Sequence, residues 1–178
     1  MVAQLQTPSL NIPSDLPYTV PGLVQVFTSG QRNFFTDVMA QALRIAGQGT
    51  PVLIVQFLKG GINQGHEHPM QLGQNLDWVR CGLRGCIDTP DIDESQKNSL
   101  LDLWNYTQSV VDEGKYELVV LDELSVAINF GLIPDIEVIE FLEKRPGNVD
   151  VILTGPDMPE AILDMADQIT NIRRSHRP

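Results

Sequence analysis

Two adjacent acids at the end of an apolar run are the residues best placed to do chemistry. The run 118–121 is followed directly by Asp122 and Glu123 in "LVVLDEL". A carboxylate at the end of a buried strand is typical of a Walker B element, where it supports a magnesium ion. Two acids that merely end a strand at the solvent edge would give the same pattern. The motif alone leaves both interpretations open.

A second segment, "TSGQRNFFTD" (28–37), lies upstream between an apolar run and an amphipathic stretch, where a phosphate-binding loop is expected. In a Walker A loop, glycines let backbone N–H groups surround the phosphates, a lysine supplies charge and a hydroxyl holds the metal. We place the two glycine positions at Ser29 and Asn33, the lysine at Phe34 and the hydroxyl at Phe35. The candidate nucleotide loop consists of Thr28, Ser29, Gly30, Gln31, Arg32, Asn33, Phe34, Phe35 and Thr36.

Short apolar runs alternate with helical periodicity along the chain and predict the elements that position these residues. The runs are 23–27, 52–57, 76–81, 117–123 and 150–155, with 168–173 as a weaker sixth. The helical segments are 36–46, 93–113, 134–147 and 158–166. With the two loop motifs, this pattern predicts an α/β, P-loop NTPase-like (RecA-like) three-layer fold with a mostly parallel sheet of about five to six strands. Ligands of such sheets bind beyond the carboxyl ends of the strands.

Composition narrows the classes of partner. The chain has 178 residues and a formal net charge of -11, which disfavours nucleic acid as a partner. No apolar stretch is long enough to span a membrane, and the start does not resemble a secretion signal, so we expect a cytoplasmic protein. Residues 1–21 are expected to form a Pro-rich arm and residues 22–178 a single domain. Cys81 and Cys86 match no common zinc or redox spacing.

The segment "GHEHP" offers a weak metal candidate. His66 and His68 stand two residues apart and could point the same way on an extended segment. A zinc site needs further well-spaced ligands. Without them, a polar surface loop is the favoured interpretation.

Several segments together resemble a known family. "GLVQVFTSG", "VLIVQFLKGG", "YELVVLDELSVAINFGLIP" and "KRPGNVDVILTG" are similar to the P-loop-type ATP:corrinoid adenosyltransferases, over roughly residues 22 to 177. The family transfers the 5′-deoxyadenosyl group of ATP to a Co(I) corrinoid and releases triphosphate. The resemblance implies a magnesium role for Asp122 and Glu123, the triphosphate loop at 28–36, and Gln56, Lys59 and Thr154 near the nucleotide. It also implies a homodimer.

The departures from the family pattern affect ligand-facing positions. The loop lacks the lysine, both glycines and the adjacent hydroxyl, and Thr154-Gly155-Pro156 stands where the family has Thr-Gly-Arg. One hypothesis is therefore a non-catalytic or strongly altered member that binds a ligand or protein partner, with Phe34 and Phe35 filling the phosphate cavity or facing the partner. The other is an active divergent transferase that uses Asp122, Glu123 and Arg32. ATP, Mg²⁺ and a corrinoid substrate are expected if the activity is kept.

Overall fold

The apolar runs form the strands of one sheet and the periodic segments form its helices. A computed structural model of the chain describes residues 20–62 and 64–173. The predicted arm therefore lies outside the described residues, apart from its last two. The strands are β1 (Val24–Ser29), β2 (Val52–Gln56), β3 (Met70–Gln71), β4 (Leu76–Arg80), β5 (Leu118–Asp122), β6 (Asp150–Pro156) and β7 (Gln168–Ile172). The helices are α1 (Thr36–Gly47), α2 (Glu94–Asp112), α3 (Leu124–Asn129), α4 (Asp135–Lys144) and α5 (Glu160–Leu163).

The sheet runs in the order β3-β4-β2-β5-β6-β1-β7. Neighbouring strands are parallel except for the antiparallel pair of β3 and β4. This confirms the α/β class and the mostly parallel sheet. The described part of the chain has seven strands, not five to six, because β3 adds one. A two-residue strand is too short to show any periodicity in the sequence.

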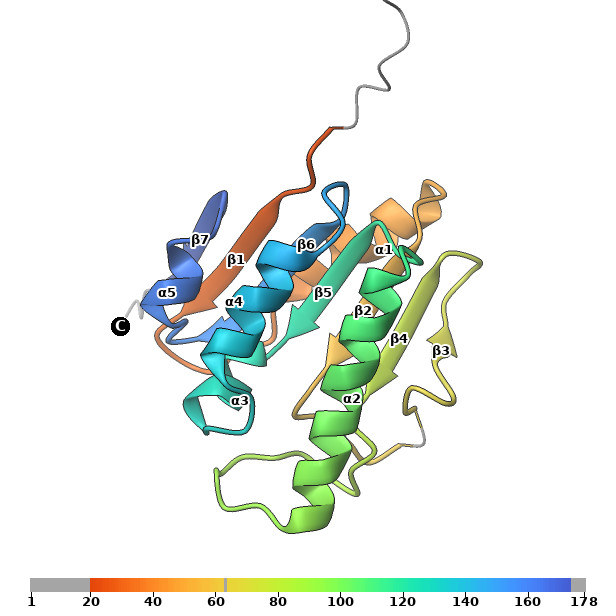
Figure 1. Cartoon of the computed structure of the whole chain (residues 1–178). Coiled ribbons are helices and arrows are strands. Elements are labelled where there is room, and N and C mark those ends of the chain that lie inside the picture. Colours follow the sequence, from red (N-terminus) through yellow and green to blue (C-terminus); the bar gives the residue numbers. More distant parts are fainter. Residues whose placement is uncertain (1–19, 63, 174–178) are drawn as a thin grey trace, which may run out of the picture.

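Helices cover both faces of the sheet, which gives three layers. Figure 1 shows α1 behind the sheet and α2, α3 and α4 in front of it. Leu53 and Val55 of β2 pack into the larger core beneath the front helices. Val52 and Ile54, which alternate with them, pack into the smaller core beneath α1. Because both faces of the central strands are buried, these strands are apolar without alternation.

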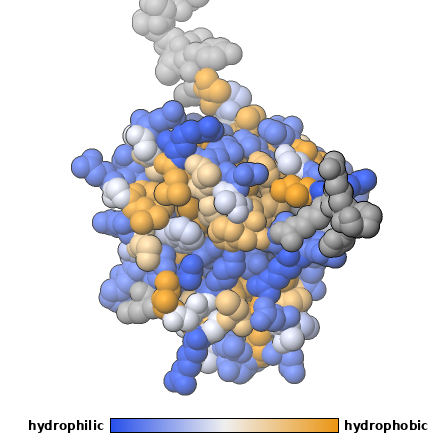
Figure 2. All heavy atoms as spheres, turned by 180° about the vertical axis from the view of Figure 1, so that it is seen from behind, coloured by the Kyte–Doolittle hydropathy of each residue, from blue (hydrophilic) through white to orange (hydrophobic). Residues whose placement is uncertain are grey.

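The face that carries α1 is shown in Figure 2, where apolar side chains gather over the middle of the sheet among polar ones. Part of this apolar surface reaches solvent: Leu43 of α1 is 46% exposed. Among residues 20–62 and 64–173, no helix has both the length and the apolar character needed to cross a membrane.

The start of α2 is fixed by side-chain capping. Asp93 caps α2 by accepting a hydrogen bond from the backbone N–H of Gln96, and the side chain of Gln96 accepts one from the backbone of Asp93. This reciprocal capping box satisfies two N–H groups at the helix start. The short helix α3, directly after β5, was not expected from the sequence.

Candidate functional site

The carboxyl ends of β2, β5 and β6 bring the predicted site residues together. Asp122, the last residue of β5, is fully buried and stands at the centre of the group. Its Oδ2 accepts hydrogen bonds from Gln56 Nε2 at 2.7 Å and from Lys59 Nζ at 3.2 Å. Its Oδ1 accepts one from Thr154 Oγ1 at 2.8 Å. Both oxygens of this carboxylate are therefore engaged by side chains of the protein.

Glu123 is paired in the same manner, with Arg32 of the candidate loop. Arg32 donates from Nε to Oε1 at 2.7 Å and from Nη2 to Oε2 at 2.8 Å, which makes a bidentate ion pair. Arg32 Nη1 also donates to Asp88 Oδ1 at 2.6 Å. The hydrogen bonds with Glu123 are the main reason that the pKa of the Arg32 guanidinium lies above its usual value. Arg32 is thus held as a cation between two carboxylates.

The backbone at Glu123, whose side chain pairs with the loop, is strained. Its φ of 61° is in the left-handed region, which is uncommon for residues other than glycine. The Glu123 N–H donates to Thr154 Oγ1 at 3.1 Å, and α3 begins at the next residue. Such strain persists where surrounding contacts hold it and is found at functional sites. We call the group formed by Arg32, Gln56, Lys59, Asp122, Glu123 and Thr154 the strand-end site.

The two phenylalanines of the loop occupy different surroundings. Phe35 is only 2% exposed and belongs to the core beneath α1. Phe34 is 49% exposed, and its ring centroid lies 4.8 Å from Lys59 Nζ. The hypothesis that Phe34 and Phe35 face a partner together is therefore wrong, because Phe35 is buried. Phe35 anchors the start of α1, whereas Phe34 covers a cation of the strand-end site.

The position of the missing lysine depends on how the motif is counted. Counting the eight-residue Walker A spacing from Ser29 moves the lysine position to Phe35 and the hydroxyl position to Thr36. Neither count gives a lysine. The Ser29 hydroxyl, buried at the end of β1, donates to the carbonyl of Gln31 at 2.6 Å, so the loop is closed by its own hydrogen bond.

A hollow of about 500 Å³ lies on the β7 side of the loop. It is bordered by Ser29 to Asn33 and, opposite them, by Ile172 and Arg173. On one side, the loop therefore contacts Glu123 through Arg32, and on the other side it borders this hollow. The predicted role of residues 28–36 as a nucleotide loop remains a prediction.

The arrangement does not fit a magnesium–triphosphate group. Mg²⁺ is bound through one or two carboxylates, substrate phosphates and water. Both oxygens of Asp122 and both oxygens of Glu123 accept hydrogen bonds from protein donors. The two cations and two acids of the strand-end site, Arg32, Lys59, Asp122 and Glu123, cancel in formal charge. A triphosphate would have to break these pairs before it met the charge of Arg32 or Lys59.

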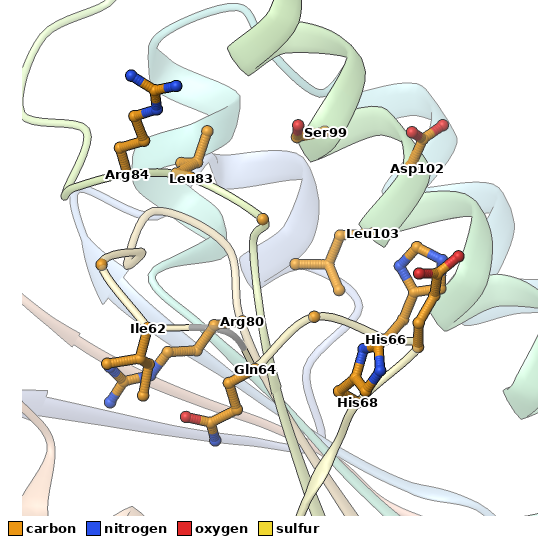
Figure 3. A pocket seen from close by; sticks show the side chains of 14 residues that line it. Ile62, Gln64, His66, His68, Arg80, Leu83, Arg84, Ser99, Asp102 and Leu103 are labelled. Carbon is orange, nitrogen blue, oxygen red and sulfur yellow. The ribbon is translucent and has the colours of Figure 1, made fainter.

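The weak metal candidate at His66 and His68 gains no third ligand. Both residues border a pocket beside α2 (Figure 3). His66 stacks on Tyr106 with ring centroids 5.1 Å apart. Within the described part of the chain, no group of three or more His, Cys, Asp or Glu residues is placed to hold a metal ion.

Sequence comparison identifies the family of the chain. The model of the family described as "ATP:corrinoid adenosyltransferase BtuR/CobO/CobP" matches residues 21–178. The chain belongs to this family. This confirms the resemblance inferred from the sequence, and the α/β sheet described above is consistent with the P-loop NTPase-like fold of this family.

Curated relatives support the assignment over most of the chain. The "Corrinoid adenosyltransferase CobA" of Salmonella typhimurium is 29% identical over 153 residues, which cover 85% of this chain and 76% of that protein. The "Corrinoid adenosyltransferase" of Escherichia coli K12 is 28% identical over the same shares. That of a Sinorhizobium species is 25% identical over 88% of this chain and 74% of its own length.

Two residues of the region were missed from the sequence. Asp88 lies in the loop after β4 and shares Arg32 with Glu123. Arg80, the last residue of β4, donates from Nε to Gln56 Oε1 at 2.8 Å and so contacts Asp122 through Gln56. The rule that sites lie at the ends of parallel strands would have indicated Arg80, because run 76–81 was predicted as a strand. Asp88 carried no comparable signal.

Proposed function

We propose that this protein is a corrinoid adenosyltransferase family member that binds a corrinoid without carrying out ATP-dependent adenosyl transfer. The observation that carries the proposal is the internal pairing of the strand-end site. Arg32 neutralises Glu123 and Lys59 neutralises Asp122. The acids assigned by resemblance to magnesium, and the cations nearest the loop, thus serve as counter-ions for each other.

The loop chemistry supports the same conclusion. A departing triphosphate is stabilised by a lysine and by magnesium in P-loop proteins. Removing one such electrostatic contact typically lowers the rate by about 10²- to 10³-fold. In this chain the lysine and both glycines are replaced in either count, and the neighbouring hydroxyl is replaced when the lysine position is placed at Phe34. The site is therefore poorly suited to stabilise the negative charge of the leaving triphosphate.

An active divergent transferase is the alternative, and one observation favours it. Arg32 and Lys59 are 30% and 21% exposed, respectively, and Arg32 also borders the hollow on the β7 side. Mg-ATP would then separate the two ion pairs. Its phosphates would bind Arg32 and Lys59, and its metal would bind Asp122 and Glu123. This exchange would cost both protein ion pairs.

A thermal-unfolding measurement with Mg-ATP separates the two functions. Ligand at about 100 times its Kd stabilises a fold by about 2.7 kcal/mol. We expect no shift of the wild-type Tm at millimolar Mg-ATP. The triple variant Asn33→Gly/Phe34→Lys/Phe35→Thr is expected to gain a shift, since it restores a glycine, the lysine and the hydroxyl. The matched control Asn33→Gly/Phe34→Met/Phe35→Thr, which lacks only the new charge, should show none.

Each variant is compared with its own unliganded form. Removing the buried Phe35 ring costs about 3 kcal/mol or more of stability in both triples, so only the ligand-induced shift is informative. A saturable shift of the wild-type protein with Mg-ATP would contradict the proposal and favour the active transferase.

A further inference from the structure

The strand β7 forms one edge of the sheet, and its outer side pairs with no strand in the part of the chain that the structure describes. It stands last in the strand order and pairs only with β1. Figure 1 shows β7 and β3 at opposite edges of the sheet. Successive residues of a strand point their N–H and C=O groups to opposite sides, so about half of the β7 backbone faces outward.

The β7 edge lacks the features that usually protect an edge strand. Natural sheets limit unwanted pairing at their edges with very short strands, charged side chains or proline. The opposite edge is short, because β3 has two residues. In contrast, β7 has five residues, QITNI, none of them charged and none proline. It has the properties of an edge that receives another strand.

The segment before β1 has the sequence pattern of such a strand. In "SLNIPSDLPY" (9–18), the even-numbered residues are apolar or aromatic except for Ser14, and they are Leu10, Ile12, Ser14, Leu16 and Tyr18. The odd-numbered residues are Ser9, Asn11, Pro13, Asp15 and Pro17. Alternation with a period of two is typical of a strand that buries one face.

The two prolines of this segment have the spacing that an outermost strand requires. Proline has no backbone N–H, so within sheets it is confined to edge strands, with that position facing solvent. Pro13 and Pro17 are four residues apart, and both would point to the same side of a strand. In a strand outside β7, both prolines can face away from the sheet. The N–H groups of Ser14 and Leu16 would then face β7.

The path of the chain before β1 brings this segment within reach of β7. Residues 1–19 precede Val20, the first described residue, and the Gly22 N–H donates to the carbonyl of Gly147 at 2.7 Å, before the start of β6. A strand outside β7 lies two strand spacings, roughly 10 Å, from β1. About three or four residues span this distance, and Pro21-Gly22 is a turn dipeptide. The segment can therefore turn back and run antiparallel to β7.

Apolar side chains near this edge are open to solvent. Val20 is 70% exposed and Ile169 of β7 is 51% exposed. Ile169 stands opposite Val26 of the larger core, whereas Ile172 packs against the smaller core beneath α1. Each face of β7 therefore carries an isoleucine, and the even-numbered residues of the segment meet one of them on either face.

We propose that residues 9–18 add an antiparallel strand to the outer edge of β7. The segment is covalently joined to β1, which gives it a high effective concentration at this edge. A second copy would instead bring a further net charge of -11 to the contact. Ile172 and Arg173 border the hollow beside the loop 28–36, so the added strand would lie on the outer side of that hollow. The inference is independent of the proposed function.

Hydrogen exchange of single backbone amides, measured by NMR on the full chain, tests the added strand. Without this strand, only the β7 amides that face β1 exchange slowly, and these are every second residue of Gln168–Ile172. With it, we expect the amides between them to exchange slowly as well, because they donate to residues 9–18.

Two neighbouring proline variants test the direction in which the segment faces. Ser14→Pro removes an N–H that faces β7, and we expect the outward β7 amides to exchange about fivefold faster, the value of about one hydrogen bond. Asp15→Pro is the matched control, because its N–H faces away from the sheet. Exchange should then stay within about twofold of the wild type.

A second pair of variants tests the apolar face without changing the backbone. Leu16→Ser is expected to accelerate the same amides by about fivefold or more, because it removes a buried apolar side chain. Asn11→Ser, on the opposite face of the segment, should leave their exchange unchanged. This pair decides the matter if Ser14→Pro does not fold.

Each outcome supports or overturns the proposal. Slow exchange of the outward β7 amides that is lost in Ser14→Pro, kept in Asp15→Pro and unchanged on tenfold dilution supports the added strand. Slow exchange at every second β7 amide only, or equal effects of the two proline variants, would overturn it. Protection that falls on dilution would also overturn it and would assign the edge to a second copy of the chain.

Discussion

The strand-end site and the pocket beside α2, which His66 and His68 border, differ in how their polar groups are used. In the strand-end site, each oxygen of Asp122 and Glu123 accepts a hydrogen bond from a protein donor. Gln64, which borders the pocket beside α2, has a buried Oε1 without a hydrogen-bond partner among the described residues. Gln56 joins the two regions, since it bonds Asp122 on one side and Arg80 on the other.

The paired charges decide what a ligand would have to displace at the strand ends. A group with paired charges gains little by exchanging partners, because a ligand must first break the pairs. A ligand at the strand ends, where the family resemblance places ATP, would therefore meet charges that are already paired.

The largest effect is expected from breaking the ion pair between Arg32 and Glu123. Glu123 is 4% exposed, so Arg32→Met leaves a buried carboxylate without its counter-ion. We expect a loss of about 3 kcal/mol in the free energy of unfolding, measured by urea denaturation. The double variant Arg32→Met/Glu123→Gln should recover much of this loss, because no buried charge is left unpaired.

A surface ion pair provides the comparison for that experiment. Lys144 and Glu140 pair at 2.7 Å with both side chains exposed. Lys144→Met is expected to change stability by less than about 0.5 kcal/mol. If Arg32→Met costs no more than Lys144→Met, the strand-end site is not held together as described.

A smaller effect is expected from two glycines near the strand-end site. Gly155 has a φ of 139°, and a Cβ there would lie 2.1 Å from Ser125 Oγ. Gly155→Ala is expected to destabilise the fold by more than about 1 kcal/mol in urea denaturation. Gly30→Ala, in the loop itself, meets nothing within 4 Å and should stay within about 0.5 kcal/mol.

The two glycine variants test whether the loop packs as the structure shows. A phosphate-binding loop needs its glycines for the approach of the backbone to the ligand. A marked loss of stability in Gly30→Ala, with little effect of Gly155→Ala, would mean that the loop packs differently from the structure.

The sequence predicted the fold well where patterns are long. Runs 52–57 and 117–123 are apolar at every central position, and they became the doubly buried strands β2 and β5. The weaker run 168–173 became β7 at the sheet edge. By contrast, β3 is two residues long and α3 six, so neither could show a period before the structure placed them.

The sequence predicted which residues meet in the candidate site, but not which of them form ion pairs with each other. Gln56, Lys59, Asp122 and Thr154 meet as expected, because parallel strands end at one edge of the sheet. The partner of Arg32 could not be predicted. It depends on the left-handed backbone at Glu123, which is set by tertiary contacts and not by local sequence.

Formation of adenosylcobalamin tests the central claim most directly. The protein is incubated with Mg-ATP and chemically reduced Co(I) cobalamin, and the product is followed by absorbance together with released triphosphate. We predict no product above the protein-free reaction, since the strand-end site is internally neutralised. Protein-dependent formation of adenosylcobalamin with one triphosphate for each adenosyl group transferred would contradict the account.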